Sequence, residues 1–474
     1  MTDRPAVFVL FGATGDLARR MVLPAFYQLA QHDLLPPEWL LVGSGRGDLS
    51  HDDFRERVRK ALEEFGPDLQ DDAWEGFAAR LRFAGGGFGP DDPGQLLGAL
   101  AEARDEVGQD AQVVHYLAIP PTAFTRVTEG LGAHDLAGGA RVVYEKPFGT
   151  SPEDFRRLDE VVHGVLEEPQ VYRIDHFLGK EGTQDLHVLR FGNGLFDHVW
   201  SREHVRAVQI DVPETLDVAD RASFYDETGA LLDMVVTHLF QIAAEVAMEP
   251  PASLSSDDLQ QAREAAIGAF RPLTPDDVVL GQFEGYTDLE DVAEGSTTDT
   301  YAAVRLWVDT DRWRDVPFLM RTGKQLARSE QRVSLVFRAP EDGPLGDAVP
   351  TLGNVLTLSL SGSGAVVLRM VVKRPGAGDE LTCAETDLSL AEVAGADPLP
   401  PYVRLLHDVL QGDRSLFTRP DGLASAWDAL APVLKQRPGV QPYARGSWGP
   451  AAADALAAPD GWLLGDAQDA PAAG

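Results

Sequence analysis

The sequence predicts a two-domain chain, an α/β half with a parallel sheet followed by an α+β half dominated by antiparallel strands. Three observations lead to this prediction. The chain has 474 residues, more than one ordinary core accommodates. Its first part alternates short apolar strands with amphipathic helices, the order of βαβ units. From Val205 onward, strand-like segments follow one another with few helices between them, which favours an antiparallel sheet.

The first strand is expected at Ala6–Phe11, a uniformly apolar run typical of a buried parallel strand. It leads directly into Gly12-Ala13-Thr14-Gly15-Asp16-Leu17. A helix is expected next, because apolar residues recur at helical spacing at Leu17, Met21, Leu23, Phe26 and Leu29. Strand, glycine turn and helix in this order indicate a dinucleotide-binding turn, in which the backbone approaches a pyrophosphate. An ordinary tight turn is the alternative, because the spacing departs from G-x-G-x-x-G.

A second expected strand, Trp39–Val42, carries the residues that bear on the choice of coenzyme. Arg46 follows it, and a guanidinium suits the 2′-phosphate of NADP. Asp48 favours the ribose 2′-hydroxyl of NAD, while the hydroxyl of Thr14 can serve either coenzyme. The sequence therefore predicts NADP, with NAD possible.

The rest of the first half follows the same alternation. Ser50 is expected to cap a helix with the buried stripe Phe54, Val58 and Leu62, and Ser151 to cap another helix with the stripe Phe155, Leu158 and Val162. Strands are expected at Val113–Ile119, Arg141–Tyr144 and Val171–Ile174, and a helix at Lys180–Phe191. Ligands of open α/β sheets bind beyond the carboxyl ends of the strands. Lys146 follows one of these strands, so we expect it near a bound ligand.

The second half is expected to hold five strands and three helical segments. The strands are Val205–Val212, Tyr301–Val308, Arg332–Phe337, Val355–Leu360 and Ala365–Val372. The helices are Gly229–Met248, Tyr402–Leu410 and a segment from Asp421. The stretch from Ala451, rich in Ala, Gly, Pro and Asp, is expected to be a loose tail.

Charge and composition argue against several classes of protein. Lys+Arg 41 against Asp+Glu 75 give a formal net charge of -34, unfavourable for binding nucleic acid or an anionic membrane. We expect no membrane-spanning segment, and the N-terminal apolar run is too short for a signal peptide. Cys383 is the single cysteine, so no intrachain disulfide is possible. These features predict a cytoplasmic protein.

The stretch Arg173-Ile174-Asp175-His176-Phe177-Leu178-Gly179-Lys180-Glu181 combines a carboxylate, an imidazole and cations. Asp175 is a candidate partner for His238, a histidine in an otherwise apolar helix, because an imidazole held by a carboxylate is a positioned general base. Asp233 lies five residues before His238, about 140° around an ideal α-helix. The two are therefore not expected to share a face unless Asp233 belongs to an irregular first turn of the helix.

A further group of cations indicates an anionic ligand. Arg321 and Lys324, with His176 and Lys180, are candidates for a phosphate cradle, which needs donors from separate segments. No metal site is expected, because the spacing of His176, His187, His198 and His204 is not that of metal ligands.

These segments together resemble the glucose-6-phosphate dehydrogenase family over nearly the whole chain. The matching segments are Gly12–Leu17, Tyr116–Pro121, Glu145–Gly149, Arg173–Glu181, Val188–Asn193, Asp233–His238, Arg321–Lys324 and Gly446–Pro450. The resemblance implies a Rossmann domain, expected over residues 1–175. It implies a C-terminal domain over residues 176–474, built on a large mixed, mainly antiparallel sheet through which such enzymes dimerise, so a homodimer or homotetramer is expected. The implied reaction is oxidation of β-D-glucose 6-phosphate at C1 to 6-phosphogluconolactone, with hydride transfer to NADP.

The resemblance also implies a role for each candidate site residue. His238 is the general base, and Asp175 orients it. The substrate phosphate is held by His176, Lys180 and Lys324, and the sugar hydroxyls by Lys146, Glu214 and Asp233. The coenzyme is bound by Gly12, Thr14, Gly15, Asp16, Leu17, Arg46 and Lys146.

Three departures from the family pattern leave other interpretations open. Phe177 stands where the family usually has tyrosine, and Thr237 where it usually has asparagine. Asp48 makes the coenzyme pocket more acidic than in strongly NADP-selective members of the family. An oxidoreductase of the glucose–fructose oxidoreductase type shares the Glu-Lys-Pro motif but has no use for the cation cluster. A catalytically silent regulatory homologue has no need of both Asp175 and His238.

Overall fold

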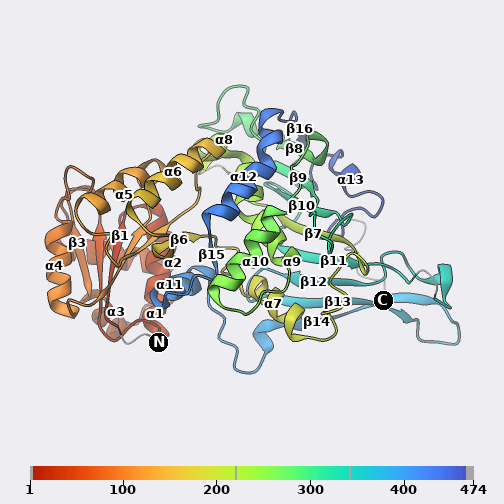
Figure 1. The fold of residues 1–474 in the computed structure, drawn as a ribbon, viewed down its shortest axis with the longest axis horizontal. Helices are drawn as coiled ribbons and strands as arrows, with labels where there is room; N and C mark the ends of the chain where they lie inside the picture. Colours follow the sequence, from red (N-terminus) through yellow and green to blue (C-terminus); the bar gives the residue numbers. More distant parts are fainter. Residues whose placement is uncertain (1–3, 219–220, 341–342, 466–474) are drawn as a thin grey trace. The chain divides into compact units, whose positions relative to one another are not determined.

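The computed structural model describes residues 4–218, 221–340 and 343–465, and the chain forms two compact units (Figure 1). The first unit takes in the chain as far as Gly179, together with Leu254–Gln260 and Leu399–Pro420; the second unit is the remainder. This division differs from the single boundary expected after residue 175, because two later segments return to the first unit. Local patterns do not reveal such a return.

The first unit contains a seven-stranded sheet of order β15-β6-β5-β4-β1-β2-β3. The strands are β1 (Ala6–Phe11), β2 (Trp39–Ser44), β3 (Leu81–Ala84), β4 (Gln112–Leu117), β5 (Arg141–Tyr144), β6 (Val171–Ile174) and β15 (Phe417–Thr418). Strands β1 to β6 are parallel, and β15 pairs antiparallel with β6. The chain adds β2 and β3 on one side of β1 and β4 on the other, so the switch point of this Rossmann sheet lies between β1 and β4.

Helices cover both faces of this sheet. They are η1 (Ala18–Val22), α1 (Leu23–Gln31), α2 (His51–Phe65), α3 (Asp71–Ala78), α4 (Leu96–Val107), α5 (Phe124–Ala133), α6 (Pro152–Val165) and α11 (Pro401–Gln411). Phe8 and Leu10 share one core with α1, α2 and α11, whereas α4 packs against the same strands without joining that core. Ser50 caps α2 as expected, in a capping box with Asp53. Met21, one of the apolar residues whose helical spacing predicted the first helix, is 40% exposed.

The second unit contains a nine-stranded sheet of order β14-β13-β12-β11-β7-β10-β9-β8-β16. The strands are β7 (Val205–Pro213), β8 (Val278–Phe283), β9 (Tyr301–Leu306), β10 (Phe318–Gly323), β11 (Arg332–Phe337), β12 (Val355–Ser359), β13 (Ala365–Lys373), β14 (Leu381–Ser389) and β16 (Gln441–Tyr443). Only β7 with β10 and β8 with β16 pair in parallel. The sheet is therefore mixed and mainly antiparallel, as predicted. The sequence did not predict strands β8, β10, β14 and β16.

One long helical stretch, Ala222–Ala247, runs through the second unit as α8 (Ala222–Ala230), η5 (Leu231–Leu239) and α9 (Phe240–Ala247). Gly229, where the helix was expected to begin, has a non-helical backbone with φ +70° and forms a kink between the first part of the stretch and the rest. By length and composition the whole stretch would be able to cross a membrane, contrary to the expectation that no segment could, but 89% of its most apolar window is buried inside the protein. A helix in a protein core can have the length and apolar composition of a membrane-spanning helix. The other α-helices of the described residues are α7 (Glu181–Gly192), α10 (Ser256–Gly268), α12 (Pro420–Lys435) and α13 (Ala453–Leu456).

The expectation of a loose tail from Ala451 is wrong for residues 451–465. Trp462, Leu463 and Leu464 are buried. The side-chain amide of Gln209 on β7 accepts a hydrogen bond from Leu463 N at 2.8 Å and donates one to Gly461 O at 2.9 Å. The stretch is therefore fixed by contacts that its composition does not show. Residues 466–474 lie outside the described residues.

Candidate active site

The glycine turn Gly12–Leu17 lies at the switch point of the Rossmann sheet. Gly12 has φ +72°, and a Cβ added there would lie 2.2 Å from the carbonyl oxygen of Ala118, which follows β4. Only glycine permits this approach. Gly15 N donates to Gly12 O at 2.8 Å, which closes the turn before the helix begins. A closed glycine turn leading into a helix at a switch point fits the pyrophosphate of a dinucleotide.

The structure brings Thr14 and Arg46 to the same edge of the sheet. Thr14 Oγ1 lies 3.6 Å from the position that a Cβ of Gly45 would occupy, directly beside Arg46. Arg46 itself is exposed. The carboxylate of Asp16, another predicted coenzyme residue, pairs with Arg20 at 2.8 Å and Arg19 at 3.2 Å. Partial burial raises the pKa of Asp16, but these two arginines outweigh that effect and lower it.

Lys146 follows β5, as expected, and its neighbour Glu145 is a buried carboxyl that the sequence did not single out. The hydroxyl of Tyr116 donates to Glu145, and that of Tyr402 donates to it at 3.4 Å. Burial raises the pKa of Glu145 above its usual value. The ring of Tyr402 is also stacked near that of His176, with centroids 6.4 Å apart. Tyr402 thus links the neighbour of Lys146 to His176, from a helix far along the chain.

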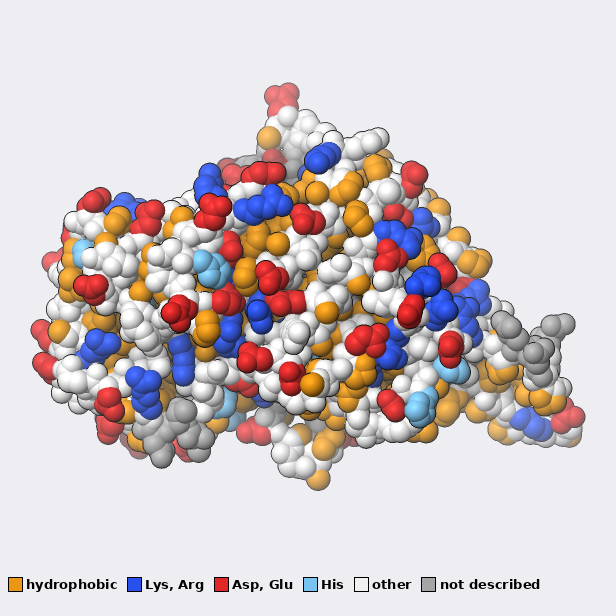
Figure 2. Space-filling model, in the orientation of Figure 1, with side chains coloured by type: hydrophobic (Ala, Val, Ile, Leu, Met, Phe, Trp, Pro, Cys, Tyr) orange, Lys and Arg blue, Asp and Glu red, His pale blue; other side chains and the backbone are white. Residues whose placement is uncertain are grey.

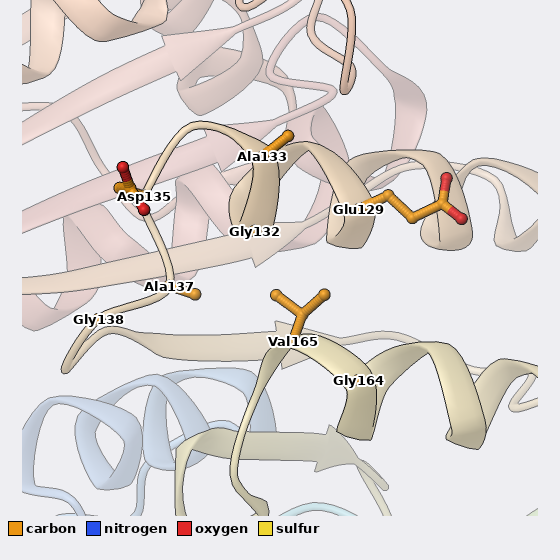
Figure 3. A pocket seen from close by; sticks show the side chains of 8 residues that line it. All are labelled: Glu129, Gly132, Ala133, Asp135, Ala137, Gly138, Gly164 and Val165. Atoms are coloured by element: carbon orange, nitrogen blue, oxygen red, sulfur yellow. The ribbon is translucent and has the colours of Figure 1, made fainter.

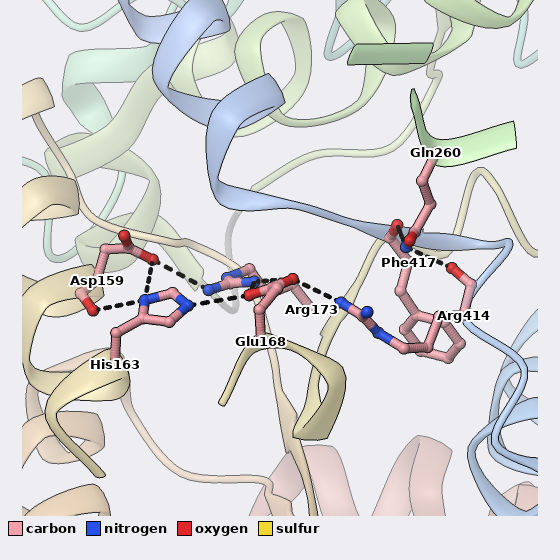
Figure 4. A network of polar contacts seen from close by, with 7 residues as sticks. All are labelled: Asp159, His163, Glu168, Arg173, Gln260, Arg414 and Phe417. Carbon is pink, nitrogen blue, oxygen red and sulfur yellow. Dashed lines mark hydrogen bonds and ion pairs between the residues drawn. The ribbon is translucent and has the colours of Figure 1, made fainter. Parts of the chain in front are cut away.

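Strand β6, which ends just before Asp175, is anchored by a partly buried ion-pair network (Figure 4). Arg173 is 4% exposed and pairs with Asp159 of α6 at 3.0 Å and with Glu168 at 2.9 Å. Glu168 also pairs with Arg414, from the returning C-terminal segment, at 2.6 Å. Asp175 is fully buried, and one of its carboxylate oxygens accepts a hydrogen bond from Phe177 N at 2.8 Å. The network fixes the strand that delivers Asp175.

In the second unit, Asp233 and His238 both lie on the π-helical segment η5. Phe240 N donates to Val235 O, and the hydroxyl of Thr237 donates to Leu232 O at 3.0 Å, both across five residues. In this register, residues five apart lie above one another. Asp233 and His238 therefore share a face, although the sequence left this open only for an irregular first turn and did not predict a π-helical register.

Lys324 and Glu214 meet at the ends of two parallel strands. Because β7 and β10 are paired, Glu214 N reaches Gly323 O at 2.9 Å, and the ammonium of Lys324 pairs with the carboxylate of Glu214. The buried ring of Tyr225 lies 5.8 Å from the same ammonium. Burial raises the pKa of Tyr225 strongly, and the charges of Asp233 and Glu214 raise it further. Tyr225, which the sequence did not single out, lies among three predicted sugar- and phosphate-binding residues.

Lys180, the remaining predicted phosphate ligand, lies at the N-terminus of α7. Its ammonium donates to the side chain of Gln331 at 2.5 Å and to Leu360 O at 3.3 Å. Gln331 directly precedes β11 and Leu360 follows β12, so residues far apart in sequence set the position of this cation.

Arg321 does not belong to a phosphate cradle. It is 1% exposed, its Nε donates to Asp211 at 2.5 Å, and its guanidinium lies over the rings of Trp448 and Trp462. The cradle expectation is wrong for this residue because Arg321 lies on β10, where residues three apart point to opposite faces. Only Lys324 of the two cations reaches Glu214.

One pocket of the first unit contains none of the predicted site residues. The hollow in Figure 3 lies between the C-terminal ends of α5 and α6. It is lined by Glu129, Gly132, Ala133, Asp135, Ala137, Gly138, Gly164 and Val165. This lining offers two carboxylates and no cation to an anionic ligand.

On the face shown in Figure 2, acidic side chains are spread among Lys and Arg.

Family models match both parts of the chain in order. The model described as glucose-6-phosphate dehydrogenase, NAD binding domain, matches residues 9–185, and that of the C-terminal domain matches residues 187–463. The chain belongs to the glucose-6-phosphate dehydrogenase family. It is therefore an oxidoreductase with a domain for a nicotinamide coenzyme, and the N-terminal match agrees with the glycine turn at the switch point.

Individual glucose-6-phosphate dehydrogenases agree with this assignment over nearly their full length. The chain is 35% identical to glucose-6-phosphate 1-dehydrogenase of Aggregatibacter actinomycetemcomitans, covering 96% of both chains, and 38% identical to glucose-6-phosphate 1-dehydrogenase 2 of Mycobacterium bovis, covering 94% of this chain and 91% of the other. The solved enzyme from Mycobacterium avium has TM-score 0.87 at 34% identity, covering 98% of this chain and 99% of the other. A glucose-6-phosphate dehydrogenase solved with glucose 6-phosphate has TM-score 0.90 at 28% identity, with coverages of 98% and 100%.

Proposed function

We propose that the protein is a glucose-6-phosphate 1-dehydrogenase that prefers NADP. The observation that carries the proposal is the ordered match of both family domains, over a chain that keeps Asp175, His176, Lys180 and His238. The reaction oxidises C1 of β-D-glucose 6-phosphate and yields 6-phosphogluconolactone.

In this proposal the imidazole of His238 takes the proton of the C1 hydroxyl as the hydride leaves. The hydroxyl is a weak acid, so a positioned base is needed. His238 is fully buried, which strengthens its interactions with neighbouring charges. Asp175 stabilises the imidazolium that forms. The bound nicotinamide coenzyme supplies the hydride acceptor.

The proposed sugar site uses the charged group around Tyr225. Asp233 and Glu214 accept hydrogen bonds from sugar hydroxyls. Lys146 donates hydrogen bonds to oxygens of sugar hydroxyls. Lys324, held beside Glu214, contributes positive charge toward the 6-phosphate together with His176 and Lys180. Phosphate binding remote from C1 orients the reacting carbon, which is a large part of the expected rate enhancement.

The preference for NADP rests on Arg46. Arg46 is exposed and follows β2, and its neighbour Gly45 lies beside Thr14, at the edge where a Rossmann domain takes the adenosine ribose. A guanidinium binds a phosphate through paired hydrogen bonds, which a 2′-hydroxyl does not offer.

A dimer through the large sheet is part of the proposal. Strand β13 shows its apolar side chains only half-buried, and Met370 and Leu388, on β13 and β14, are 43% and 55% exposed. Light scattering after size exclusion should give a dimer or a tetramer. Met370→Glu with Leu388→Glu should shift it to the monomer, and an unaltered mass for this variant would contradict the placement of the interface.

The reaction is tested by initial rates with NADP and NAD, each with glucose 6-phosphate and with free glucose, on one purified sample. Turnover confined to the phosphorylated sugar is expected, with NADP preferred. Equal turnover of free glucose would favour the glucose–fructose oxidoreductase type. Absence of turnover with all four pairs would favour a silent homologue.

A further inference from the structure

The loop between β3 and α4, residues 85–95, is bonded to the turn that carries Arg46. We call it the glycine loop. Gly87 N donates to Gly45 O and Gly86 N donates to Gly47 O, both at 3.1 Å. The carbonyl groups on either side of Arg46 are therefore held by one loop.

The contact between loop and turn is too close for any side chain at Gly85. A Cβ there would lie 2.3 Å from Gly47 O and 3.4 Å from Asp48 Cα. Neither segment can move without the other, so the glycine loop sets the position of the Arg46 backbone.

Gln95, at the end of the glycine loop, contacts both the loop and Asp48. Its side-chain oxygen accepts a hydrogen bond from Gly85 N at 2.9 Å, and its side-chain nitrogen donates to Asp48 Oδ1 at 3.3 Å. Asp48 is the carboxylate whose charge opposes a nearby 2′-phosphate, and it lies two residues from Arg46. The Gln95 side chain is exposed, so its replacement does not open a core.

We propose that the glycine loop is a specificity-determining element for the coenzyme. It holds the Arg46 turn, and through Gln95 it directs the charge of Asp48 toward the loop and away from a 2′-phosphate on the adenosine ribose. This inference rests on the NADP preference proposed above and deepens it.

The first test is calorimetric binding of adenosine 2′,5′-bisphosphate and of AMP, two probes that differ only in the 2′-phosphate. Gln95→Leu should weaken binding of the bisphosphate on the order of 3- to 10-fold, because Asp48, no longer held by Gln95, would repel the 2′-phosphate through solvent of high dielectric. The affinity for AMP should stay within about twofold of the wild-type value. The same substitution combined with Asp48→Asn should have no selective effect. Equal weakening of both probes, or an undiminished effect without the Asp48 charge, would overturn the proposal.

A second test displaces the turn itself. Gly85→Ala should weaken the bisphosphate more than AMP, whereas Gly98→Ala, on α4 with no heavy atom within 4 Å of its added Cβ, should change neither. If Gly85→Ala fails to fold, Gln95→Leu decides alone. Wild-type protein that binds both probes equally would overturn the coenzyme preference and this inference together. Turnover of glucose 6-phosphate with NAD would then still support the reaction.

Discussion

Asp233 and His238 lie on one face of the same helix because the segment that contains them is π-helical. The start of this segment is held by Asp299, whose carboxylate accepts a hydrogen bond from Leu231 N at 2.7 Å and pairs with Arg437. On an α-helix the two side chains would diverge by about 140°. The π-helical register therefore places a proposed sugar ligand and the proposed base together.

Replacing the proposed base should remove turnover and spare binding. His238→Asn should lower kcat by about 10²–10⁴-fold with little change in the KM for glucose 6-phosphate, because general-base loss affects the chemical step. Steady-state kinetics measures this. His204→Asn, at an exposed histidine, is the matched control. An unchanged kcat in His238→Asn would contradict the assignment of His238 as the general base.

The hydroxyl of Thr237 should stabilise the π-helical segment. Thr237→Val keeps the shape of the side chain but loses the hydrogen bond to Leu232 O, so the free energy of unfolding should fall by about 1 kcal/mol. Urea denaturation measures the loss, and Thr237→Ser, which keeps a hydroxyl, should recover most of it. Equal stability of the Val and Ser variants would show that this bond contributes nothing.

Lys180 should act on the phosphorylated substrate alone. Lys180→Ala should raise the KM for glucose 6-phosphate by at least about tenfold, since a charge-assisted hydrogen bond to phosphate contributes roughly 1.5–3 kcal/mol. Free glucose, which has no phosphate, should react as poorly as with the wild type. Lys60→Ala, at an exposed lysine of α2, is the control. A parallel change for both sugars would argue against phosphate binding by Lys180.

Arg321 should matter for stability and not for substrate binding. Arg321→Met leaves the buried carboxylate of Asp211 without its nearest cation, which typically costs about 3–5 kcal/mol. Chemical denaturation should show this loss, while the KM of the folded fraction stays near the wild-type value. Adding Asp211→Asn should restore part of the stability. A selective rise in KM at unchanged stability would revive the phosphate-cradle interpretation.

The carboxylate of Glu245 should contribute to stability in a defined pH range. It is buried, which raises its pKa, but Arg263 and His187 outweigh burial and lower the pKa to about 2 from a usual 4.5. A lowered folded-state pKa gives stability that is present above the unfolded value and lost as pH falls through the folded value. The stability gap between wild type and Glu245→Gln should therefore narrow from about pH 4.5 toward pH 2. A gap independent of pH would contradict this ion pairing.

Much of the fold follows from local pattern. The apolar run Ala6–Phe11, the cap at Ser50 and the strand Arg141–Tyr144 each lie where the sequence predicted them. Strand β10 was missed, because Arg321 interrupts its apolar pattern. The partner that makes a buried arginine acceptable, Asp211, lies 110 residues away in the sequence.

The sequence by itself determined the alternation of strands and helices in the first half, the glycine turn at Gly12 and the family, because periodicity, capping and motif spacing are local properties. Only the tertiary structure decided that Arg321 is buried while Lys324 reaches Glu214. It also decided that Tyr402 donates a hydrogen bond to Glu145, and that Asp233 shares a face with His238. Each of these depends on partners distant in the chain or on a helical register that side-chain periodicity does not specify.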